Sequence, residues 1–353
     1  MTSVKELEAD PHPLLARLRE TEPVAWVPAL NCWLVTRRDL ALAVMRDSEA
    51  FTVDDPRFST GQVVGRSMLT TDGEEHARQR APYARPFRLD AVRERFTAVV
   101  EEEVERLIAE LEPAGRGELR RELAGPLAAQ TMVVALGLED VGVGQMLRWY
   151  DAIVDATSGL SAGRPVPDAA NRAVAELRSH GAGSNEAVLL FGGIETTEGM
   201  ICNALLHLLS HDDQLALVRE DRSLLGAAIE ESLRLEPSAA SIDRYATREL
   251  QLGGATIAEG DLVTVSIAAA SRDPSTFPDP DRFDIRRENA GRHVAFAGGP
   301  HVCIGMHLAR LETSIAIGGL LDRLAGLRLD PERPATPRGL VFRKPPELHV
   351  LWG

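Results

Sequence analysis

Helical periodicity runs through most of this sequence and restricts what the chain can fold into. Apolar residues recur every three or four positions in long stretches separated by turn residues, which is the pattern of amphipathic helices. Strand-like alternation is confined to a hairpin pattern near Val24 to Val35, to the segment from Tyr245 to Val265 and to the last part of the chain. We therefore expect a mainly α protein with small β-sheets. The expected helices cover residues 38–46, 75–87, 89–111, 119–136, 144–160, 169–180, 185–210, 214–220, 224–235 and 308–324.

The composition is that of a folded protein and excludes several partners. Of the 353 residues, 44% are hydrophobic and 26% are charged, which provides enough apolar area for a core. The 39 Lys and Arg residues against 53 Asp and Glu residues give a net charge of -14, so we expect no nucleic-acid partner. No apolar run approaches the ~18 residues of a membrane span, and the first residues lack the regions of a signal peptide. We therefore expect a cytoplasmic protein that binds no membrane.

No linker divides the chain, so we expect a single domain over residues 1–353. Serine- and glycine-rich stretches and charge blocks that could separate two domains are missing from the sequence. A nucleotide-binding domain is not indicated either. Gly142 and Gly144 begin a glycine pattern, but Leu147 replaces the third glycine and the surrounding βαβ pattern is missing.

The most informative segment presents a cysteine directly before a helix. The run from Phe296 to Gly305 reads FAGGPHVCIG, and helical periodicity follows it at once. The N–H groups at a helix N-terminus favour a thiolate, so Cys303 is a candidate soft ligand or nucleophile. Glycines at 298, 299 and 305 would let a flat, bulky group approach closely. An isolated cysteine in a reducing compartment is more often a buried structural thiol, but this setting favours a functional one.

The run FAGGPHVCIG resembles the haem-binding loop FxxGxHxCxG of the cytochrome P450 family. The resemblance implies that Cys303 is the proximal thiolate ligand of the haem iron and that Phe296, Gly298 and Gly305 shape the loop around it. Ala297 stands where the family very often has glycine. The resemblance also implies the P450 fold, with haem b between the central long helix and the helix that follows the cysteine loop.

A second motif, Gly192 to Thr197 within the expected helix 185–210, resembles the acid–alcohol pair of the same family. The Thr196 hydroxyl can bond to the carbonyl of Gly192 one turn earlier and open the helix locally. The resemblance implies that Glu195 relays protons and that Thr196 directs protonation during oxygen activation. The alternative is a helix kink without chemistry.

Glu231 and Arg234 form an ExxR spacing, which on its own is most often a solvated surface pair. With Arg287 they resemble the buried Glu–Arg–Arg cluster of the P450 family, which implies that they hold the cysteine loop in shape. The resemblance further implies cationic residues for the two haem propionates, and His76 and Arg80 share one helical face for this purpose. The expected propionate-binding residues are His76, Arg80, Arg244, His293 and His301.

The substrate pocket is expected where apolar residues would face the distal side of the haem. Each of these residues is equally readable as part of the core. Their apolar character favours a hydrophobic or aromatic substrate. The candidates are Val63, Val64, Met68, Leu189, Gly192, Ala239, Ala240, Ile242, Leu340 and Val341.

Taken together, the resemblance implies a bacterial monooxygenase that hydroxylates or epoxidises a small organic molecule, in secondary-metabolite biosynthesis of the antibiotic type. The substrate is either free or tethered to a carrier protein. Electrons would come from NAD(P)H through an external ferredoxin and ferredoxin reductase, because the sequence shows no flavin or nicotinamide domain. Two other functions stay open: a non-catalytic haem-binding sensor or electron carrier, and a hydrolase with Cys303 as its nucleophile.

One departure from the family lies before the central helix. The family normally interposes further helices between the segment 169–180 and the acid–alcohol helix, whereas only a few residues stand there in this chain. Two or three helices of ordinary length amount to ~40 residues. We therefore expect a P450 domain that is shortened between about residues 178 and 187, either because the protein lacks these helices or because a disordered stretch is missing from the sequence.

Overall fold

The computed structural model describes residues 3–161 and 164–353, which fall into two compact units. Unit 1 consists of residues 1–53, 202–303 and 329–348, and unit 2 consists of residues 54–201, 304–328 and 349–353. Two elements have residues in both units. The long helix α10 (Ser184–Leu209) passes from unit 2 to unit 1 at Cys202, and the short strand β9 (Arg328–Leu329) does so at Leu329.

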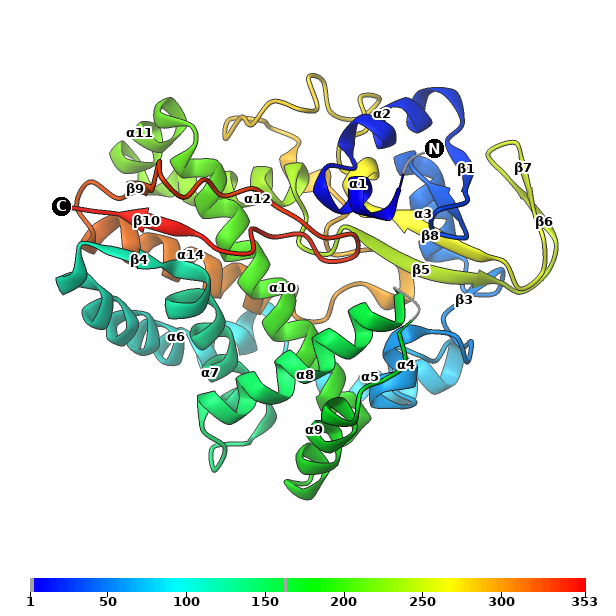
Figure 1. Ribbon diagram of the computed structural model, residues 1–353, viewed down its shortest axis with the longest axis horizontal. Helices are drawn as coiled ribbons and strands as arrows, with labels where there is room; N and C mark the ends of the chain where they lie inside the picture. The colour runs from blue at the N-terminus through cyan, green and yellow to red at the C-terminus, as the bar shows by residue number, and fades with distance from the viewer. Residues whose placement is uncertain (1–2, 162–163) are drawn as a thin grey trace. The chain divides into compact units, whose positions relative to one another are not determined.

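Unit 1 is built on a five-stranded sheet in the order β1-β2-β8-β5-β3 (Figure 1). The first two strands form the antiparallel hairpin that the sequence predicts, and β2 runs parallel to β8. The remaining pairs, β8 with β5 and β5 with β3, are antiparallel, and β6 and β7 form a separate hairpin. The strands are β1 (Val24–Val27), β2 (Cys32–Val35), β3 (Phe51–Thr52), β5 (Ser241–Ala246), β6 (Leu250–Leu252), β7 (Ala255–Ile257) and β8 (Leu262–Ser266).

The core of unit 1 lies between this sheet and the helix α3 (Arg38–Arg46). Val35, Val263 and Val265 are completely buried and pack in one apolar cluster with Val44 and Met45 of α3. Branched side chains suit such a pleated surface, and their burial explains the strand signal in this part of the sequence. The other helices of unit 1 are α1 (Val4–Ala9), α2 (His12–Thr21), α11 (Asp212–Glu220), α12 (Leu225–Leu235) and α13 (Ile267–Ala270), with the 3-10 turns η3 (Arg222–Leu224), η4 (Ala290–Arg292) and η5 (Gly299–His301).

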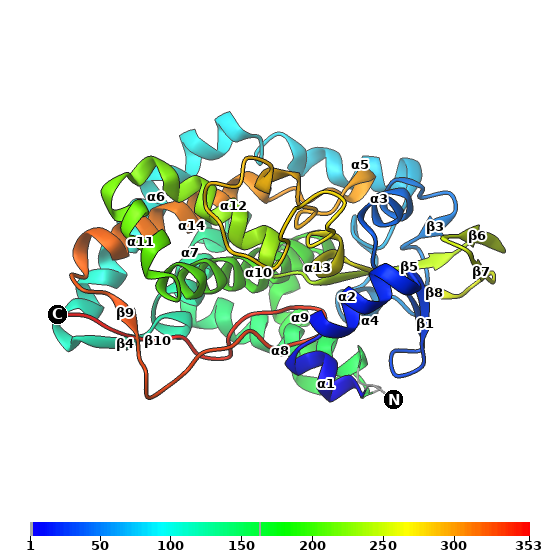
Figure 2. The same cartoon turned by 90° about the horizontal axis from the view of Figure 1, so that it is seen from above.

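Unit 2 is mainly helical, and its most extensive helix pair is α6 (Leu89–Leu111) with α14 (Met306–Arg323) (Figure 2). A side chain at Gly319 of α14 would come within 2.9 Å of Val104 of α6, so glycine permits this close approach. A strand pair of β4 with β10 completes the unit. Its other elements are α4 (Ser59–Val64), α5 (Gly73–Ala84), α7 (Gly125–Leu136), α8 (Val143–Ser161), α9 (Asp168–Ser179), β4 (Arg116–Glu118), β10 (His349–Leu351), the 3-10 turn η1 (Glu112–Ala114) and the π-helix η2 (Arg120–Ala124).

The prediction of a mainly α fold with small sheets is confirmed, and most expected helices end within a few residues of the observed ones. The expected helix 119–136 is divided, because Pro126 has no N–H for an α-helical bond and the Gly125 N–H bonds to the carbonyl of Arg120 instead. The expected helix 75–87 ends at Ala84; Arg85 still has helical backbone, and Pro86 has no N–H to continue the helical bonds. The prediction of one shortened domain stays a prediction. In the structure α9 ends at Ser179 and α10 begins at Ser184.

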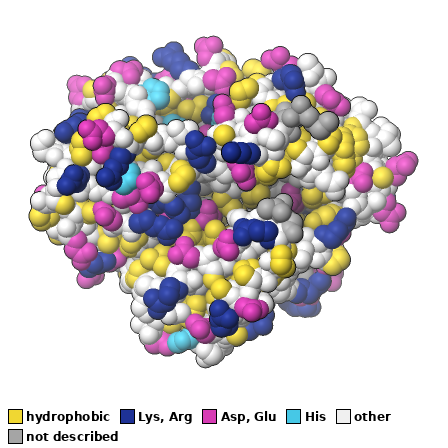
Figure 3. Space-filling view, viewed as in Figure 1, with side chains coloured by type: hydrophobic (Ala, Val, Ile, Leu, Met, Phe, Trp, Pro, Cys, Tyr) yellow, Lys and Arg dark blue, Asp and Glu magenta, His cyan; other side chains and the backbone are white. Residues whose placement is uncertain are grey.

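The surface is charged, and none of the described helices is both long enough and apolar enough to cross a membrane. On the face drawn in Figure 3, basic and acidic side chains lie interspersed among apolar and uncharged ones. The excess of 53 acidic over 39 basic residues is therefore not visible on this face as a patch of a single sign.

Candidate functional site

The cysteine loop of unit 1 is held closed by its own backbone. The N–H of Cys303 donates to the carbonyl of Phe296 at 2.9 Å, and the turn η5 lies between these residues. Two positions have left-handed backbone, Ala297 with φ of 59° and Gly299 with φ of 70°. A Cβ atom at Gly299 would collide with the carbonyl oxygen of Met45, so only glycine fits the loop against α3. Helix α3 therefore sets the shape of the loop.

Cys303 differs from the other two cysteines in its exposure. Cys32 and Cys202 are buried, whereas Cys303 is partly exposed, and none of the three forms a disulfide. Burial raises the pKa of the Cys32 thiol to about 11, which keeps it protonated at neutral pH. Among the described residues, no group of three or more His, Cys, Asp and Glu side chains could hold a metal ion. A single thiolate suits a metal whose other ligands come from a macrocycle. The role of Cys303 as that ligand stays a prediction.

Two glycines leave space that a flat cofactor requires. A Cβ atom added at Gly305, two residues after Cys303, would meet no neighbouring atom within 4 Å. The same is true of Gly192 on α10, which is half-buried in a helix whose neighbouring residues are mostly buried. The residues present therefore fit a haem group: each of the two predicted motifs combines a chemically suitable side chain with a glycine beside open space.

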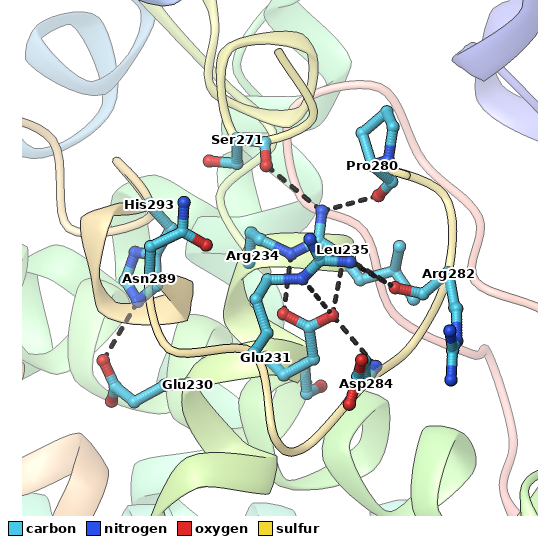
Figure 4. Close-up of polar contacts among 12 residues, drawn as sticks. Glu230, Glu231, Arg234, Leu235, Ser271, Pro280, Arg282, Asp284, Asn289 and His293 are labelled. Atoms are coloured by element: carbon cyan, nitrogen blue, oxygen red, sulfur yellow. Dashed lines mark hydrogen bonds and ion pairs between the residues drawn. The ribbon is translucent and has the colours of Figure 1, made fainter. Parts of the chain in front are cut away.

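The predicted Glu–Arg–Arg residues come together in unit 1. Figure 4 shows Glu231 and Arg234 of this cluster. Arg234 donates to both carboxylate oxygens of Glu231, from Nε at 2.7 Å and from Nη2 at 2.8 Å. Arg287 donates from Nε to Glu231 Oε1 at 3.0 Å, and the backbone N–H of Asp284 donates to the same oxygen at 3.0 Å. Glu231 and Arg234 are completely buried, so this is an internal ion cluster and not a surface pair.

The two arginines of this cluster also fix an irregular chain segment. Arg234 donates to the carbonyls of Pro280 at 2.6 Å and of Arg282 at 3.0 Å. Arg287 donates to the carbonyls of Pro278 at 2.6 Å and of Asp279 at 3.0 Å. Helices and strands satisfy their own carbonyls, but a segment without regular structure cannot, so these side chains replace the missing backbone bonds. The segment that leads to the cysteine loop is thereby held in one conformation.

In unit 2, the expected propionate ligands His76 and Arg80 lie one turn apart on α5. His76 is buried, and its Nδ1 lies 2.7 Å from the carbonyl oxygen of Met68. This contact makes Nδ1 the donor to Met68, so binding of a propionate at Nε2 requires a ring that carries a proton on both nitrogens. Arg80 is half-buried. Their role as propionate ligands stays a prediction.

The three expected propionate ligands of unit 1 lie on different elements. Arg244 is buried on β5 and donates from Nη1 to the carbonyl of Asp243 at 2.7 Å. His293 accepts the N–H of Ala295 at Nδ1, at 3.1 Å, and its Nε2 lies 3.3 Å from Glu230 Oε2. His301 is half-buried in the turn η5. The contacts of His293 brace the start of the cysteine loop, and the binding of propionates by all three stays a prediction.

The acid–alcohol motif lies on α10. Thr196 donates from Oγ1 to the carbonyl of Gly192 at 2.6 Å, as the sequence predicts, and both residues are half-buried. The neighbouring Glu195 is buried and accepts a hydrogen bond from the hydroxyl of Tyr150 on α8. Sequence reasoning missed Tyr150 and its second acidic contact, Glu198. A signal was available, because Glu198 follows Glu195 by three residues and therefore lies on the same face of the helix.

The expected pocket residues of unit 2 lie on α4, in the loop before α5 and on α10. Met68 is buried, and its N–H donates to Asn185 Oδ1 at 2.7 Å, which ties the loop before α5 to α10. Leu189 is also buried, as are the two valines at the end of α4, Val63 and Val64. Whether these residues line a pocket stays a prediction.

The expected pocket residues of unit 1 come from two paired segments. The N–H of Ala240 donates to the carbonyl of Val341 at 2.8 Å, and Ala239 forms an isolated bridge with Phe342. Ala240 lies in an apolar core cluster, and Ile242 packs against another. Ala239, Leu340 and Val341 are half-buried. The structure thus places Ala240 in the core, and the pocket assignment of these residues stays a prediction.

Comparison with known proteins identifies what the chain resembles. The sequence model of the family described as Cytochrome P450 matches residues 184–351. The chain is 34% identical to cytochrome P450 monooxygenase PikC of Streptomyces venezuelae, over 98% of this chain and 91% of that protein. It is 30% identical to 6-deoxyerythronolide B hydroxylase of Saccharopolyspora erythraea, over 97% of each chain. Both alignments are longer than this chain, at 385 and 398 positions against 353 residues, so both relatives contain residues without a counterpart here.

The fold is similar to that of solved structures. The structure of P450BioI in complex with an acyl carrier protein ligated to hexadec-9Z-enoic acid superposes with a TM-score of 0.87. The two chains are 28% identical, and the similarity covers 100% of each. The expected fold, in which small sheets accompany a mainly helical chain, is confirmed by this likeness.

Proposed function

The chain belongs to the cytochrome P450 family and is a monooxygenase, and from this premise we propose that Cys303 is the thiolate ligand of a haem b iron. Membership of the family implies a haem cofactor and external redox partners. When bound, haem supplies the iron centre at which dioxygen is activated with two electrons. The observation that carries the proposal is the partly exposed thiol of Cys303 at the end of a loop that α3 and Gly299 fix in place.

The residues around Cys303 favour its thiolate form and hold it in position. Gly305 is the N-cap of α14, so Cys303 precedes the N-terminus of an 18-residue helix, where N–H groups and the helix dipole stabilise an anion. Glu231, Arg234 and Arg287 act as positioning residues, because they fix the segment before the loop. His76, Arg80, Arg244, His293 and His301 would bind the propionates, and Phe296 and Gly298 shape the loop.

Thr196 and Glu195 would handle protons. The hydroxyl proton of Thr196 is donated to the carbonyl of Gly192, so its oxygen presents lone pairs that accept a hydrogen bond. As a hydrogen-bond acceptor, the Thr196 oxygen would hold a proton-donating group in a fixed position beside it. Glu195, the residue before Thr196, would carry protons from the interior of unit 2 to Thr196. We therefore assign the catalytic roles to these two side chains.

The proposed reaction is hydroxylation or epoxidation of a small hydrophobic or aromatic molecule in secondary metabolism of the antibiotic type. The similarity to 6-deoxyerythronolide B hydroxylase, 30% over 97% of each chain, supports this class of reaction. A carrier-tethered substrate is a second candidate, and the likeness to P450BioI bound to an acyl carrier protein supports it. We propose that electrons reach the protein from NAD(P)H through a ferredoxin and its reductase.

Reconstituted turnover tests the proposal. The haem-loaded protein is combined with a ferredoxin, its reductase and NADPH, and candidate ligands, free and carrier-bound, are first screened for a spin-state change of the iron. Thr196→Ala should retain the haem spectrum, form less product per NADPH and release more hydrogen peroxide, while the adjacent Thr197→Ala serves as the matched control. Equal coupling in the wild type and Thr196→Ala would contradict the role of Thr196. NADPH-dependent reduction without any oxidised product would favour a sensor or an electron carrier.

A further inference from the structure

Glu236 and Arg343 form a second buried ion pair in unit 1. Arg343 donates from Nε to Glu236 Oε1 at 2.9 Å, and the two residues are only 2% and 5% exposed. The other carboxylate oxygen lies 3.0 Å from Nε2 of His12 on α2 and 3.8 Å from Nη2 of Arg272. Burial opposes ionisation, but the bond to His12 and the charges of both arginines lower the pKa of Glu236 to about 2. Glu236 is therefore a carboxylate at neutral pH and balances the charge of Arg343.

The Arg343 side chain also closes the turn that precedes it in the chain. Its Nη1 donates to the carbonyl of Gly339 at 2.7 Å, and its Nη2 donates to the carbonyl of Pro337 at 3.1 Å. Gly339 has a φ of 111°, and a Cβ atom there would collide with the carbonyl oxygen of Phe342. We call residues 339–342 the glycine turn. It is tight and irregular, and Arg343 satisfies carbonyls that a helix or a strand would satisfy itself.

The glycine turn is paired with the segment that follows α12. The N–H of Ala240 donates to the carbonyl of Val341 at 2.8 Å, and the N–H of Arg343 donates to the carbonyl of Ser238 at 2.8 Å. Glu236 lies two residues before Ser238. The ion pair between Glu236 and Arg343 therefore joins the same two segments as these backbone bonds, and it fixes the register in which they pair.

Further contacts anchor the turn within unit 1. The N–H of Gly339 donates to the carbonyl of Glu8 in α1 at 2.9 Å, and Arg343 Nη1 reaches the same carbonyl at 3.1 Å. The side-chain amide of Asn203 donates to the backbone carbonyls of Glu236 at 3.0 Å and of Arg343 at 2.9 Å. Asn203 belongs to the part of α10 that lies in unit 1. The position of the turn is thus set by helices from both ends of the unit 1 sequence.

We propose that Glu236 and Arg343 are positioning residues for the substrate. Through the glycine turn they hold Leu340 and Val341 against an apolar part of the bound molecule. The inference rests on the proposed function and deepens it. Leu340 and Val341 are half-buried, whereas the ion pair is enclosed, so these two side chains are the part of the turn that a ligand can reach. The carbonyl of Val341 is already bonded to Ala240, so the contact with the substrate is apolar.

The geometry of the guanidinium makes arginine necessary at position 343. Its planar fork of N–H groups lets Arg343 bind Glu236 and the carbonyls of the turn at the same time. Lysine keeps the charge and can keep the ion pair, but it has no such fork. Arg343→Lys therefore loosens the turn without burying an unpaired carboxylate. The matched control is Arg19→Lys, because Arg19 is also buried in unit 1 and donates to the carbonyl of Ala269, at 3.0 Å, outside the turn.

Hydrogen exchange of the haem-loaded protein tests whether Arg343 holds the turn. The amides of Gly339 and Ala240, whose bonds anchor and pair the turn, should exchange at least about tenfold faster in Arg343→Lys than in the wild type. Arg19→Lys should leave both rates unchanged. Equal exchange in the wild type and Arg343→Lys would overturn the positioning role.

Two probe ligands test whether the turn contacts a bound molecule. Imidazole and 4-phenylimidazole both bind haem iron through a ring nitrogen, but only 4-phenylimidazole carries an additional apolar ring. In spectral titrations, Arg343→Lys should weaken the binding of 4-phenylimidazole at least about fivefold more than that of imidazole. The double variant Leu340→Ala/Val341→Ala, which keeps the ion pair, should show the same selective loss, and Arg19→Lys should not. A merely structural role would lower the urea midpoint and leave the ratio of the two affinities unchanged.

The outcomes separate this inference from the proposed function. If the wild type shows no thiolate haem spectrum, the proposed function fails. If that spectrum is intact and both variants of the turn keep the wild-type ratio of affinities, only this inference fails. Faster exchange in Arg343→Lys with an unchanged ratio would also overturn it. If Arg343→Lys is too unstable to retain haem, the double variant decides, and a wild-type ratio in that variant would overturn the inference.

Discussion

Glu231→Gln tests the role of the buried ion cluster, because it removes one charge and almost no volume. The Glu231 carboxylate accepts two hydrogen bonds from Arg234, one from Arg287 and one from the N–H of Asp284, at 2.7 to 3.0 Å. Removing the charge leaves the fully buried guanidinium of Arg234 without its counter-ion. Breaking a buried pair in this way costs about 3–5 kcal/mol, a large part of the ~5–15 kcal/mol by which proteins are stable.

Urea denaturation of the haem-loaded protein measures this loss, followed by haem absorbance and by circular dichroism. The matched control is Glu110→Gln, since Glu110 pairs with Arg106 on the surface of α6 and its side chain is 64% exposed. An exposed pair contributes about 0–1 kcal/mol. Arg287→Lys keeps the charge but loses carbonyl contacts. Its decrease in the free energy of unfolding should therefore lie between those of Glu231→Gln and Glu110→Gln. A loss below about 1 kcal/mol for Glu231→Gln, equal to that of Glu110→Gln, would refute the argument.

Two further perturbations concern the loop and the pH dependence of stability. Ala297→Gly should raise the free energy of unfolding by up to about 1.5 kcal/mol, because left-handed backbone costs an alanine about 1–2 kcal/mol and the greater freedom of glycine offsets about 0.5–1 kcal/mol. A lower urea midpoint would contradict this. Burial lowers the pKa of His207 to about 3, so below about pH 6.5 the unfolded chain takes up a proton that the folded protein does not. Stability should therefore fall from about pH 6.5 toward pH 3, by up to ~1.4 kcal/mol per pH unit, and His207→Gln should flatten this slope in pH-dependent denaturation; an unchanged slope would contradict the assignment.

Local features of the fold were predictable from the sequence. Helix α6 occupies the expected range 89–111 because its apolar spacing is regular and no proline interrupts it. Deviations arise at prolines, where backbone chemistry outweighs apolar periodicity: Pro126 turns the start of the expected helix 119–136 into the π-helix η2. The bond from Thr196 to the Gly192 carbonyl was also predictable, since both groups lie on one turn of one helix.

Features that depend on packing between distant segments were not predictable. The sequence indicates that Glu231 and Arg234 share a helix face, but not that their partners are the carbonyls of Pro280 and Arg282. The left-handed backbone of Ala297 follows from how its loop lies on α3. This conformation is the physical reason why the family very often has glycine at the position of Ala297. The contacts of Tyr150 with Glu195 and Glu198 were not predicted, because Tyr150 lies on α8 and the two glutamates lie on α10.

The absorption spectrum of the reduced, carbon-monoxide-treated protein is the most direct test that Cys303 ligates haem iron. The account predicts the red-shifted band that a thiolate ligand produces, and the loss of that band in Cys303→Ser. Cys202→Ser, which changes a buried cysteine, serves as the control and should keep the band. A colourless protein, or a thiolate band that persists in Cys303→Ser, would contradict the account.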